Sequence, residues 1–330
     1  MKQLLASMSL AQKVGQLFLI RCPQENETEA VACFQPAGLV LFSVDFENRT
    51  AQQCLERVQA MQEASLIPMV VSADEEGGTV CRVSRQPALR ESKFPSPREL
   101  YAAGKWEAVE ADAEEKCALL KSVGVNVNLA PVCDLSDDPE HFIYQRAVSG
   151  DPKLASSFVK RVVTLSESRG VGTVLKHFPG YGGNADTHVG MSRDGRSLKE
   201  FREKDLVPFA AGIEAGCGAI MMSHNIIVCL DPRNPASLSP RMHDFLRAEM
   251  KFDGVVITDD LKMDAVSQYW DAGEAAVQAV LAGNDLLCAS QWEVQLPAVL
   301  RAAENGQLPQ ERLDQAVLRV LNWKHKLGLI

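Results

Sequence analysis

The chain has 330 residues, of which 46% are hydrophobic and 23% are charged. A chain of this length and composition can bury a sizeable core, and it is too rich in hydrophobic residues for a disordered tail or linker. The formal net charge of −9 disfavours sequence-independent binding to nucleic acid or to an anionic membrane surface, because either would require a basic stripe. We therefore expect a globular protein whose partner is a small molecule.

The cysteines are odd in number and widely spaced, and they form no Cys-x-x-Cys pair: Cys22, Cys33, Cys54, Cys81, Cys117, Cys133, Cys217, Cys229 and Cys288. This pattern argues against both a disulfide framework and a zinc site. The apolar start of the chain is too short and broken for a secretory signal, and no segment reaches the roughly 20 apolar residues of a membrane span. We expect buried thiols, a cytoplasmic location and no membrane span.

Short runs rich in β-branched residues alternate with longer amphipathic segments, which is typical of parallel strands joined by crossover helices. The expected strands, in chain order, cover residues 17–20, 38–42, 69–73, 125–129, 173–176, 219–223, 255–258 and 286–289. The expected helices carry apolar residues at three- and four-residue steps and cover residues 51–64, 106–122, 153–168, 198–215, 239–250, 272–281 and 293–303. Asp151 before Pro152 and Ser239 before Pro240 have the pattern of helix caps.

The alternation of these elements predicts an α/β fold, specifically a closed (β/α)8 barrel of the TIM type. An open doubly wound sheet more often has fewer strands and a glycine-rich first turn, and no such turn follows Ile20. The amphipathic segment 309–329 is expected to seal the outside of the barrel. No linker or repeat interrupts the pattern, so residues 1–330 are expected to form a single domain.

Polar side chains stand at the ends of several expected strands. Asp74 ends the third strand, Lys176 and His177 end the fifth, His224 follows the sixth and Asp259 follows the seventh. In barrels of this type the chemistry takes place at the carboxyl ends of the strands and in the loops that follow them. The sequence therefore brings these side chains to one rim of the barrel.

The glycine-containing loop over residues 178–196 carries Asp186 and His188. An Asp-x-His step sets an imidazole, which titrates near neutral pH, beside a carboxylate that can fix its tautomer. A strand-end acid such as Asp259 can attack a carbon centre. Together these groups indicate an enzyme that cleaves sugars by a double displacement.

Each of these residues also has a simpler structural explanation. An isolated Asp259 more often caps a helix that begins near Asp260, and an isolated His177 is more often a hydrogen-bonded core histidine. The glycines over 180–183 could cradle a phosphate, but they lack the ending of a P-loop. No His-x-x-x-His pair accompanies His188, so acid–base chemistry is favoured over a metal, and we expect neither a metal nor a cofactor. The combination at one rim favours catalysis.

Three motifs together resemble glycoside hydrolase family 3, and within it the single-barrel β-N-acetylglucosaminidases. The motifs are Lys176-His177-Phe178-Pro179-Gly180-Tyr181-Gly182 with Asp186-Thr187-His188, Asp74-Glu75-Glu76-Gly77-Gly78 with Arg82, and Ile257-Thr258-Asp259-Asp260-Leu261-Lys262-Met263. The resemblance begins at Lys13-Val14-Gly15-Gln16-Leu17 and continues to the last helices, so it covers nearly the whole chain. Each motif alone is moderately specific, and the three together are strongly specific.

The resemblance implies a role for each catalytic group. Asp259 would be the nucleophile that forms a covalent glycosyl-enzyme, and no cofactor would be needed. His188, held by Asp186, would protonate the leaving oxygen and then deprotonate the incoming water. Such a loop dyad is the mark of the single-barrel branch, whereas the related two-domain β-glucosidases take a glutamate from a second domain.

The resemblance also implies a set of contacts around the terminal sugar: Asp74, Arg82, Arg146, Lys176, His177 and His224. Asp74 would bind sugar hydroxyls, and His224 would have a supporting role. Two features depart from the family pattern. Tyr181 stands where more familiar members have a histidine, in a stretch that is one residue shorter than theirs. Glu75 replaces a common glutamine, and we expect it to add negative charge near the pocket and to bear on which sugar is preferred.

These inferences predict an exo-acting, retaining β-N-acetylhexosaminidase that removes terminal N-acetylglucosamine from an amino-sugar oligosaccharide or a muropeptide-type substrate, in the recycling of cell-wall peptidoglycan. A family 3 β-glucosidase, or a phosphorylase that transfers the sugar to phosphate, would use the same residues. Two other classes stay open. A Schiff-base lyase could use Lys176, but it would leave Asp259 without a role. The second alternative class is a noncatalytic sugar-binding protein built on the same barrel.

Overall fold

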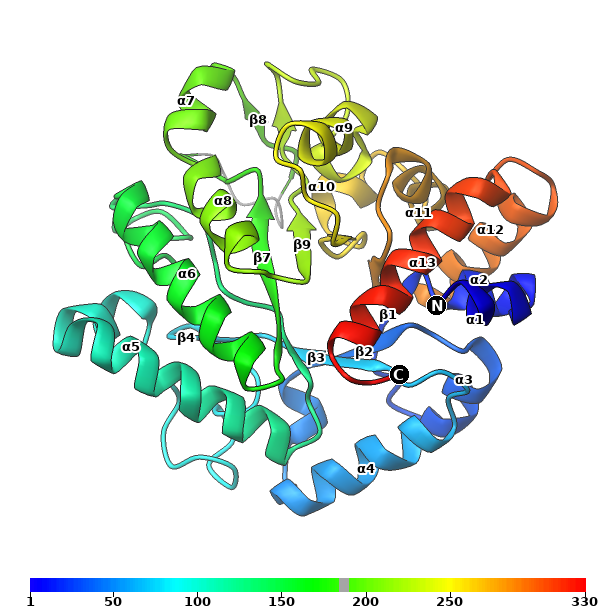
Figure 1. The fold of residues 1–330 in the computed structure, drawn as a ribbon, viewed down its shortest axis with the longest axis horizontal. Coiled ribbons are helices and arrows are strands. Elements are labelled where there is room, and N and C mark those ends of the chain that lie inside the picture. Colours follow the sequence, from blue (N-terminus) through cyan, green and yellow to red (C-terminus); the bar gives the residue numbers. More distant parts are fainter. Residues whose placement is uncertain (184–189) are drawn as a thin grey trace.

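A parallel eight-stranded sheet, closed into a barrel, is the centre of the fold (Figure 1). The computed structural model describes residues 1–183 and 190–330. In spatial order the strands are β11 (Val255–Thr258), β9 (Ala219–Met222), β7 (Gly172–Phe178), β6 (Val127–Asn128), β3 (Val70–Ala73), β2 (Gly38–Leu41), β1 (Phe18–Arg21) and β12 (Leu287–Ala289). A parallel bridge between Ile257 and Leu286 joins the first and last of these strands. All the predicted strands are confirmed, and so is the barrel.

Helices surround the strands on the outside (Figure 1). The principal ones are α4 (Ala51–Glu63), α5 (Pro97–Ser122), α6 (Pro152–Ser168), α8 (Leu206–Glu214), α9 (Pro240–Ala248), α11 (Ala272–Ala282), α12 (Trp292–Glu304) and α13 (Gln310–Lys326). Shorter helices are α1 (Lys2–Ser7), α2 (Leu10–Gly15), α3 (Glu27–Phe34), α7 (Leu198–Glu203) and α10 (Asp264–Ser267). Two small ladders accompany the barrel: β4 (Glu75–Gly77) pairs with β5 (Val80–Cys81), and β8 (Arg193–Asp194) pairs with β10 (Ile226–Ile227).

Each of the seven segments expected to be helical is helical, but α1, α2, α3 and α10 were not expected, and two boundaries differ from the expected ones. The single helix expected over 198–215 is two helices, because Lys204 leaves the helical conformation at φ −126° and ψ −81°. Helix α5 begins earlier than expected, at Pro97, and is kinked at Gly104 and Lys105. Both predicted caps are present, since Asp151 accepts a hydrogen bond from the Lys153 amide and Ser239 accepts one from the Met242 amide.

Alternate strand residues divide between the barrel interior and the layer under the helices. Leu19, Val40 and Val174 belong to the interior cluster, whereas Ile20 and Leu39 pack toward the helices. The sequence predicts that helix α13 seals the outside of the barrel, but the helix lies across one end of the barrel instead. Its residues Val320 and Trp323 join the interior cluster, and Trp323 lies so close to Gly218, just before β9, that a Cβ there would be 2.1 Å from its indole nitrogen. The helix therefore closes the end of the barrel where the strands begin.

Helix α13 also buries a lysine. The Lys324 ammonium donates to Gln16 Oε1 at 2.7 Å, and its side chain is fully buried. Burial in this apolar layer lowers the pKa of Lys324 from its ordinary 10.5 to about 7. None of the described helices is both long and apolar enough to cross a membrane.

We expect Lys324 to make stability depend on pH. Between pH 7 and 10.5 the unfolded chain holds a proton that the native lysine has lost, so native stability rises with pH across this window. Lys324→Met should remove this dependence and be relatively more stable at pH 7 than at pH 10, by about 3–4 kcal/mol at about 1.4 kcal/mol per pKa unit. Urea unfolding from pH 6 to 10 measures the difference. Lys153→Met, at an exposed site, is the control, and a pH-independent difference for Lys324→Met would contradict the prediction.

Candidate active site

A pocket of about 520 Å³ opens at the carboxyl ends of the barrel strands. Its lining contains Asp74 after β3, Lys176 and His177 in β7, and Asp259 after β11. Arg82 and Arg146 reach it from the loops that follow β5 and precede α6. The structure therefore brings together strand-end residues that are far apart in the sequence, at the rim where the barrel fold places chemistry.

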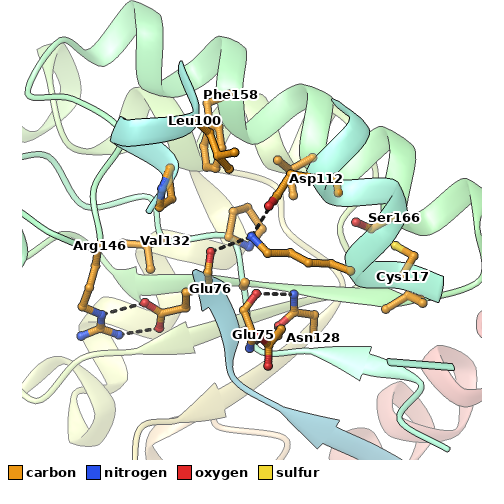
Figure 2. Close-up of a pocket in the computed structure, with 17 residues that line it drawn as sticks. Glu75, Glu76, Leu100, Asp112, Cys117, Asn128, Val132, Arg146, Phe158 and Ser166 are labelled. Atoms are coloured by element: carbon orange, nitrogen blue, oxygen red, sulfur yellow. Dashed lines mark hydrogen bonds and ion pairs between the residues drawn. The ribbon is translucent and has the colours of Figure 1, made fainter. Parts of the chain in front are cut away.

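Behind the lining residues Lys176 and Arg146 lies a buried charge cluster centred on Glu76. Arg146 donates two hydrogen bonds to the Glu76 carboxylate, at 2.7 and 2.8 Å, and Figure 2 shows this fork. The Lys176 ammonium lies 2.6 Å from Glu76 Oε1 and 2.6 Å from Asp74 Oδ1. Burial alone would raise the pKa of Glu76, but Arg146 and Lys176 hold it well below its usual range.

The same cluster fixes the charge of Lys176. Burial would lower its pKa, but the carboxylates of Asp74 and Glu76 raise it above the ordinary value. Lys176 is therefore an ammonium ion that orients Asp74 toward the pocket. Arg82 reaches the other oxygen of Asp74 at 3.4 Å. An amine held in this way is not a nucleophile, which argues against the Schiff-base lyase.

His177 is held in one tautomer by two neighbours. Its Nδ1 lies 2.7 Å from Asp134 Oδ2, and its Nε2 lies 3.2 Å from Arg146 Nη2. Because a guanidinium can only donate, Nε2 accepts and the proton is on Nδ1, facing Asp134. Asp134 also accepts hydrogen bonds from the backbone amides of His177 and Tyr181, at 3.0 and 2.8 Å. One carboxylate thus fixes both the histidine and the start of the following loop.

Asp259 does not cap a helix. The next helix, α10, begins at Asp264 with Met263 at its N-cap, and Asp259 lies before it in the turn that follows β11. Its Oδ1 accepts from the Asp260 amide at 2.9 Å, and its own amide donates to the Met222 carbonyl at 3.0 Å. The neighbouring Asp260 bonds to the Ser290 hydroxyl. The half-buried Asp259 carboxylate is thus anchored by its backbone and lines the pocket.

His224 lies behind this turn, and the described residues that line the pocket do not include it. Its Nε2 donates to the Asp260 carbonyl at 3.1 Å, so its Nδ1 accepts from the Ser237 hydroxyl at 2.7 Å. The side chain is fully buried. Its place in the structure fits support of the Asp259–Asp260 turn rather than contact with a substrate.

Glu75 does not line the pocket near which it was expected to add negative charge. Its side chain is fully buried and turned into the loop that follows β5, where it accepts from the amides of Arg82 at 3.0 Å and Val83 at 2.7 Å and bonds to the Ser84 hydroxyl. Figure 2 shows Glu75 beside Asn128 in the enclosed space behind the pocket. Glu75 therefore shapes the loop that carries Arg82 and adds no carboxylate to the pocket lining.

Asp186 and His188 lie outside the described residues, which stop at Gly183 and resume at Gly190. Just before this gap Tyr181 is buried, with its ring edge-on to His177 at 5.2 Å and to Phe142 at 5.0 Å. After the gap, Arg196 is fixed by ion pairs to Asp194 and Asp205. In the part of the chain that the structure describes, no group of three His, Cys, Asp or Glu side chains could hold a metal ion.

Sequence reasoning missed two buried carboxylates, Glu76 and Asp134. Glu76 stands in the quoted Asp74–Gly78 motif, but alternation along a short strand does not reveal which of two adjacent acids pairs with Lys176 and Arg146. Asp134 follows the fourth barrel strand, and its place near a strand end was the available signal. Both act by holding Lys176, His177 and Arg146 in position.

Comparisons with known proteins agree with this geometry. Residues 9–323 match the model of the glycosyl hydrolase family 3 N terminal domain. A beta-hexosaminidase of Stenotrophomonas maltophilia strain K279a is 39% identical over 304 residues, which is 89% of this chain and 84% of that protein. The structure superposes on a family 3 beta-N-acetylglucosaminidase from Paenibacillus sp. FPU-7 with a TM-score of 0.91 and 29% identity, over 98% of this chain and 63% of that one.

A beta-N-acetylhexosaminidase from Beutenbergia cavernae has a fold that matches along nearly the whole length of both chains. Its TM-score is 0.85 at 28% identity, and the match covers 97% of this chain and 99% of that one. The eight-stranded barrel, the strand-end pocket and the extent of the family match lead to one conclusion. The chain belongs to glycosyl hydrolase family 3.

Proposed function

We propose that the protein is an exo-acting, retaining β-N-acetylhexosaminidase that removes a terminal β-linked N-acetylglucosamine. The observation that carries the proposal is a single pocket in which the Asp259 carboxylate shares the lining with Asp74, Lys176 and His177. Retaining cleavage requires one ionised carboxylate as nucleophile and a second group that first gives and then takes a proton. The names of the relatives, which are beta-hexosaminidases, support the choice of sugar.

In the proposed mechanism the residues of the charge cluster bind and orient the terminal sugar. Asp74, whose oxygens already face Lys176 and Arg82, accepts hydrogen bonds from sugar hydroxyls, and Arg146 and His177 supply further polar contacts. Asp259 then attacks the anomeric carbon and forms a glycosyl-enzyme ester. His188, oriented by Asp186, donates its proton to the departing oxygen. The same histidine next takes a proton from water, which cleaves the ester and frees Asp259.

We further propose that the substrate is an amino-sugar oligosaccharide or muropeptide-type fragment handled in the cytoplasm, in the recycling of peptidoglycan. All nine cysteines lie among the described residues, and all are free thiols, which supports a reducing compartment. Burial raises the pKa of most of them, for example Cys133 and Cys288, above the ordinary value. Such thiols are poor nucleophiles and fit a packing role.

The test is release of 4-nitrophenol from 4-nitrophenyl β-glycosides of N-acetylglucosamine, N-acetylgalactosamine, glucose and xylose. We expect a kcat/KM for the N-acetylglucosaminide that is at least about 100-fold above that for the glucoside, since a site built around a polar substituent rejects an analogue that lacks it. Proton magnetic resonance of the first-formed sugar should show the β anomer. Cleavage of the glucoside alone would indicate a β-glucosidase. Release of a sugar 1-phosphate only when phosphate is present would indicate a phosphorylase.

A further inference from the structure

A pair of arginines flanks an aromatic ring at the mouth of the pocket. Arg21 is the last residue of β1, and Phe42 follows β2, the neighbouring strand. The guanidinium carbon of Arg21 lies 4.1 Å from the centroid of the Phe42 ring, and that of Arg82 lies 5.1 Å from it. All three side chains line the same pocket as Asp74 and Asp259. The ring thus fixes the plane of the Arg21 guanidinium inside the active site.

The two arginines differ in their polar partners. Arg82 forms an ion pair with Asp74, whereas the Arg21 side chain makes no hydrogen bond or ion pair with any residue that the structure describes. Lys262, which also lines the pocket, has an exposed side chain that likewise has no carboxylate partner among the described residues. The half-buried Arg21 guanidinium therefore presents its five donors to the pocket, where a ligand can accept from them.

Position in the barrel separates Arg21 from the sugar contacts on β7. In the ring of eight strands β1 lies between β12 and β2, across the barrel from β7, which carries Lys176 and His177. The acceptor for Arg21 is therefore to be found on a part of the substrate distant from the groups that Lys176 and His177 contact. Planar, fork-shaped guanidinium groups match carboxylates and phosphates, with two parallel hydrogen bonds.

We propose that Arg21, stacked on Phe42 and assisted by Lys262, binds an anionic substituent of the substrate, which is a carboxylate, sulfate or phosphate group. The inference rests on the proposed function, since it adds a charge requirement to the substrate of the same pocket. The anion is carried either by the terminal amino sugar or by the sugar that leaves. Both sources present the same chemistry to Arg21, and substrates can distinguish them.

The experiment compares kcat/KM for three substrates. The first is neutral 4-nitrophenyl N-acetyl-β-glucosaminide, the second is its 6-sulfate, and the third is a disaccharide whose leaving sugar carries a carboxylate. For Arg21→Gln we expect kcat/KM for one charged substrate, divided by kcat/KM for the neutral substrate, to fall about 10- to 100-fold. This is the size usual for a hydrogen-bonded ion pair. Arg21→Lys, which keeps the charge but loses the fork, should give an intermediate ratio. Which substrate responds identifies the sugar that carries the anion.

The control is Arg85→Gln, since Arg85 is exposed, lies in the loop that follows β5 and is absent from the pocket lining. It should leave every ratio unchanged. If Arg21→Gln leaves the ratio unchanged for both charged substrates, the inference is wrong even though the neutral substrate is still cleaved. Phosphate-dependent sugar 1-phosphate formation that Arg21→Gln abolishes would assign the site to free phosphate and also overturn it. If nothing is cleaved, the proposed function fails, and calorimetric binding of N-acetylglucosamine 6-sulfate to the folded variants decides the inference.

Discussion

Replacing Asp259 by asparagine should lower the rate of 4-nitrophenyl N-acetyl-β-glucosaminide cleavage by about 10⁴-fold or more. Loss of the nucleophile in a covalent hydrolase costs on the order of 10⁶ in kcat when the rest of the site is intact. Asparagine keeps the size of the side chain and an oxygen that can accept from the Asp260 amide, so the turn after β11 should persist. The loss therefore reports on chemistry and not on folding. Initial rates of nitrophenol release measure it.

Two further measurements make the test of Asp259 specific. Asp253→Asn changes an exposed acid just before β11, and it should retain the full rate. Asp259→Ala should recover activity when azide is added, because a small anion can occupy the vacated position and attack the anomeric carbon, giving a glycosyl azide of inverted configuration. Full activity of Asp259→Asn, or azide rescue of a different variant, would show that another group is the nucleophile.

Glu76→Gln should destabilise the protein by about 3–5 kcal/mol, because removal of one partner leaves a buried charge uncompensated. The cations left behind are Arg146 and Lys176, both of which also line the pocket, so KM should rise as well. The stabilisation from Glu76 should depend on pH. The native pKa is lowered from the ordinary 4.5, so the difference between the two proteins is complete above about pH 4.5 and shrinks as the pH falls below it.

Urea unfolding at pH 7 measures the loss of stability, and urea unfolding at pH 4 and below measures how that loss depends on pH. The matched control is Glu110→Gln on helix α5, where an exposed glutamate pairs with Arg161. Surface ion pairs contribute about 0–1 kcal/mol, so this variant should unfold at nearly the concentration of urea that unfolds the unaltered protein. A loss below about 1 kcal/mol for Glu76→Gln would show that water or local movement compensates the two cations.

The strands of this barrel were predictable because buried parallel strands leave short β-branched runs between amphipathic segments. The helix boundaries were less predictable from the sequence. The break between α7 and α8 has a signal, since Asp205 stands at the N-cap of α8 and Pro208 in its first turn, but the apolar residues continue at helical spacing on both sides. The kink at Gly104 in α5 has a signal, a glycine within a helix, but a glycine alone does not distinguish a kink from a continuous helix.

For the site, the sequence indicated which strand ends carry chemistry but not which way each side chain turns. Asp74 and Glu76 alternate with Glu75 along the chain, and only the structure shows that the outer two share Lys176 while Glu75 bonds to backbone amides. His224 was expected to have a supporting role, and the structure shows which groups it contacts, since its two ring nitrogens form hydrogen bonds with Ser237 and Asp260. Side-chain direction at a strand end depends on the adjacent turn, which a strand pattern does not specify.

The two oxygens of Asp134 hold the start of the loop that follows β7. One oxygen holds His177 and the other holds the Tyr181 amide, so the backbone is tied to the barrel as far as Tyr181. On the far side the ion pairs of Arg196 with Asp194 and Asp205 tie the chain again. For protein engineering these anchors are natural splice points. A chimera that exchanges only residues between Tyr181 and Asp194 for those of a relative keeps every one of these contacts.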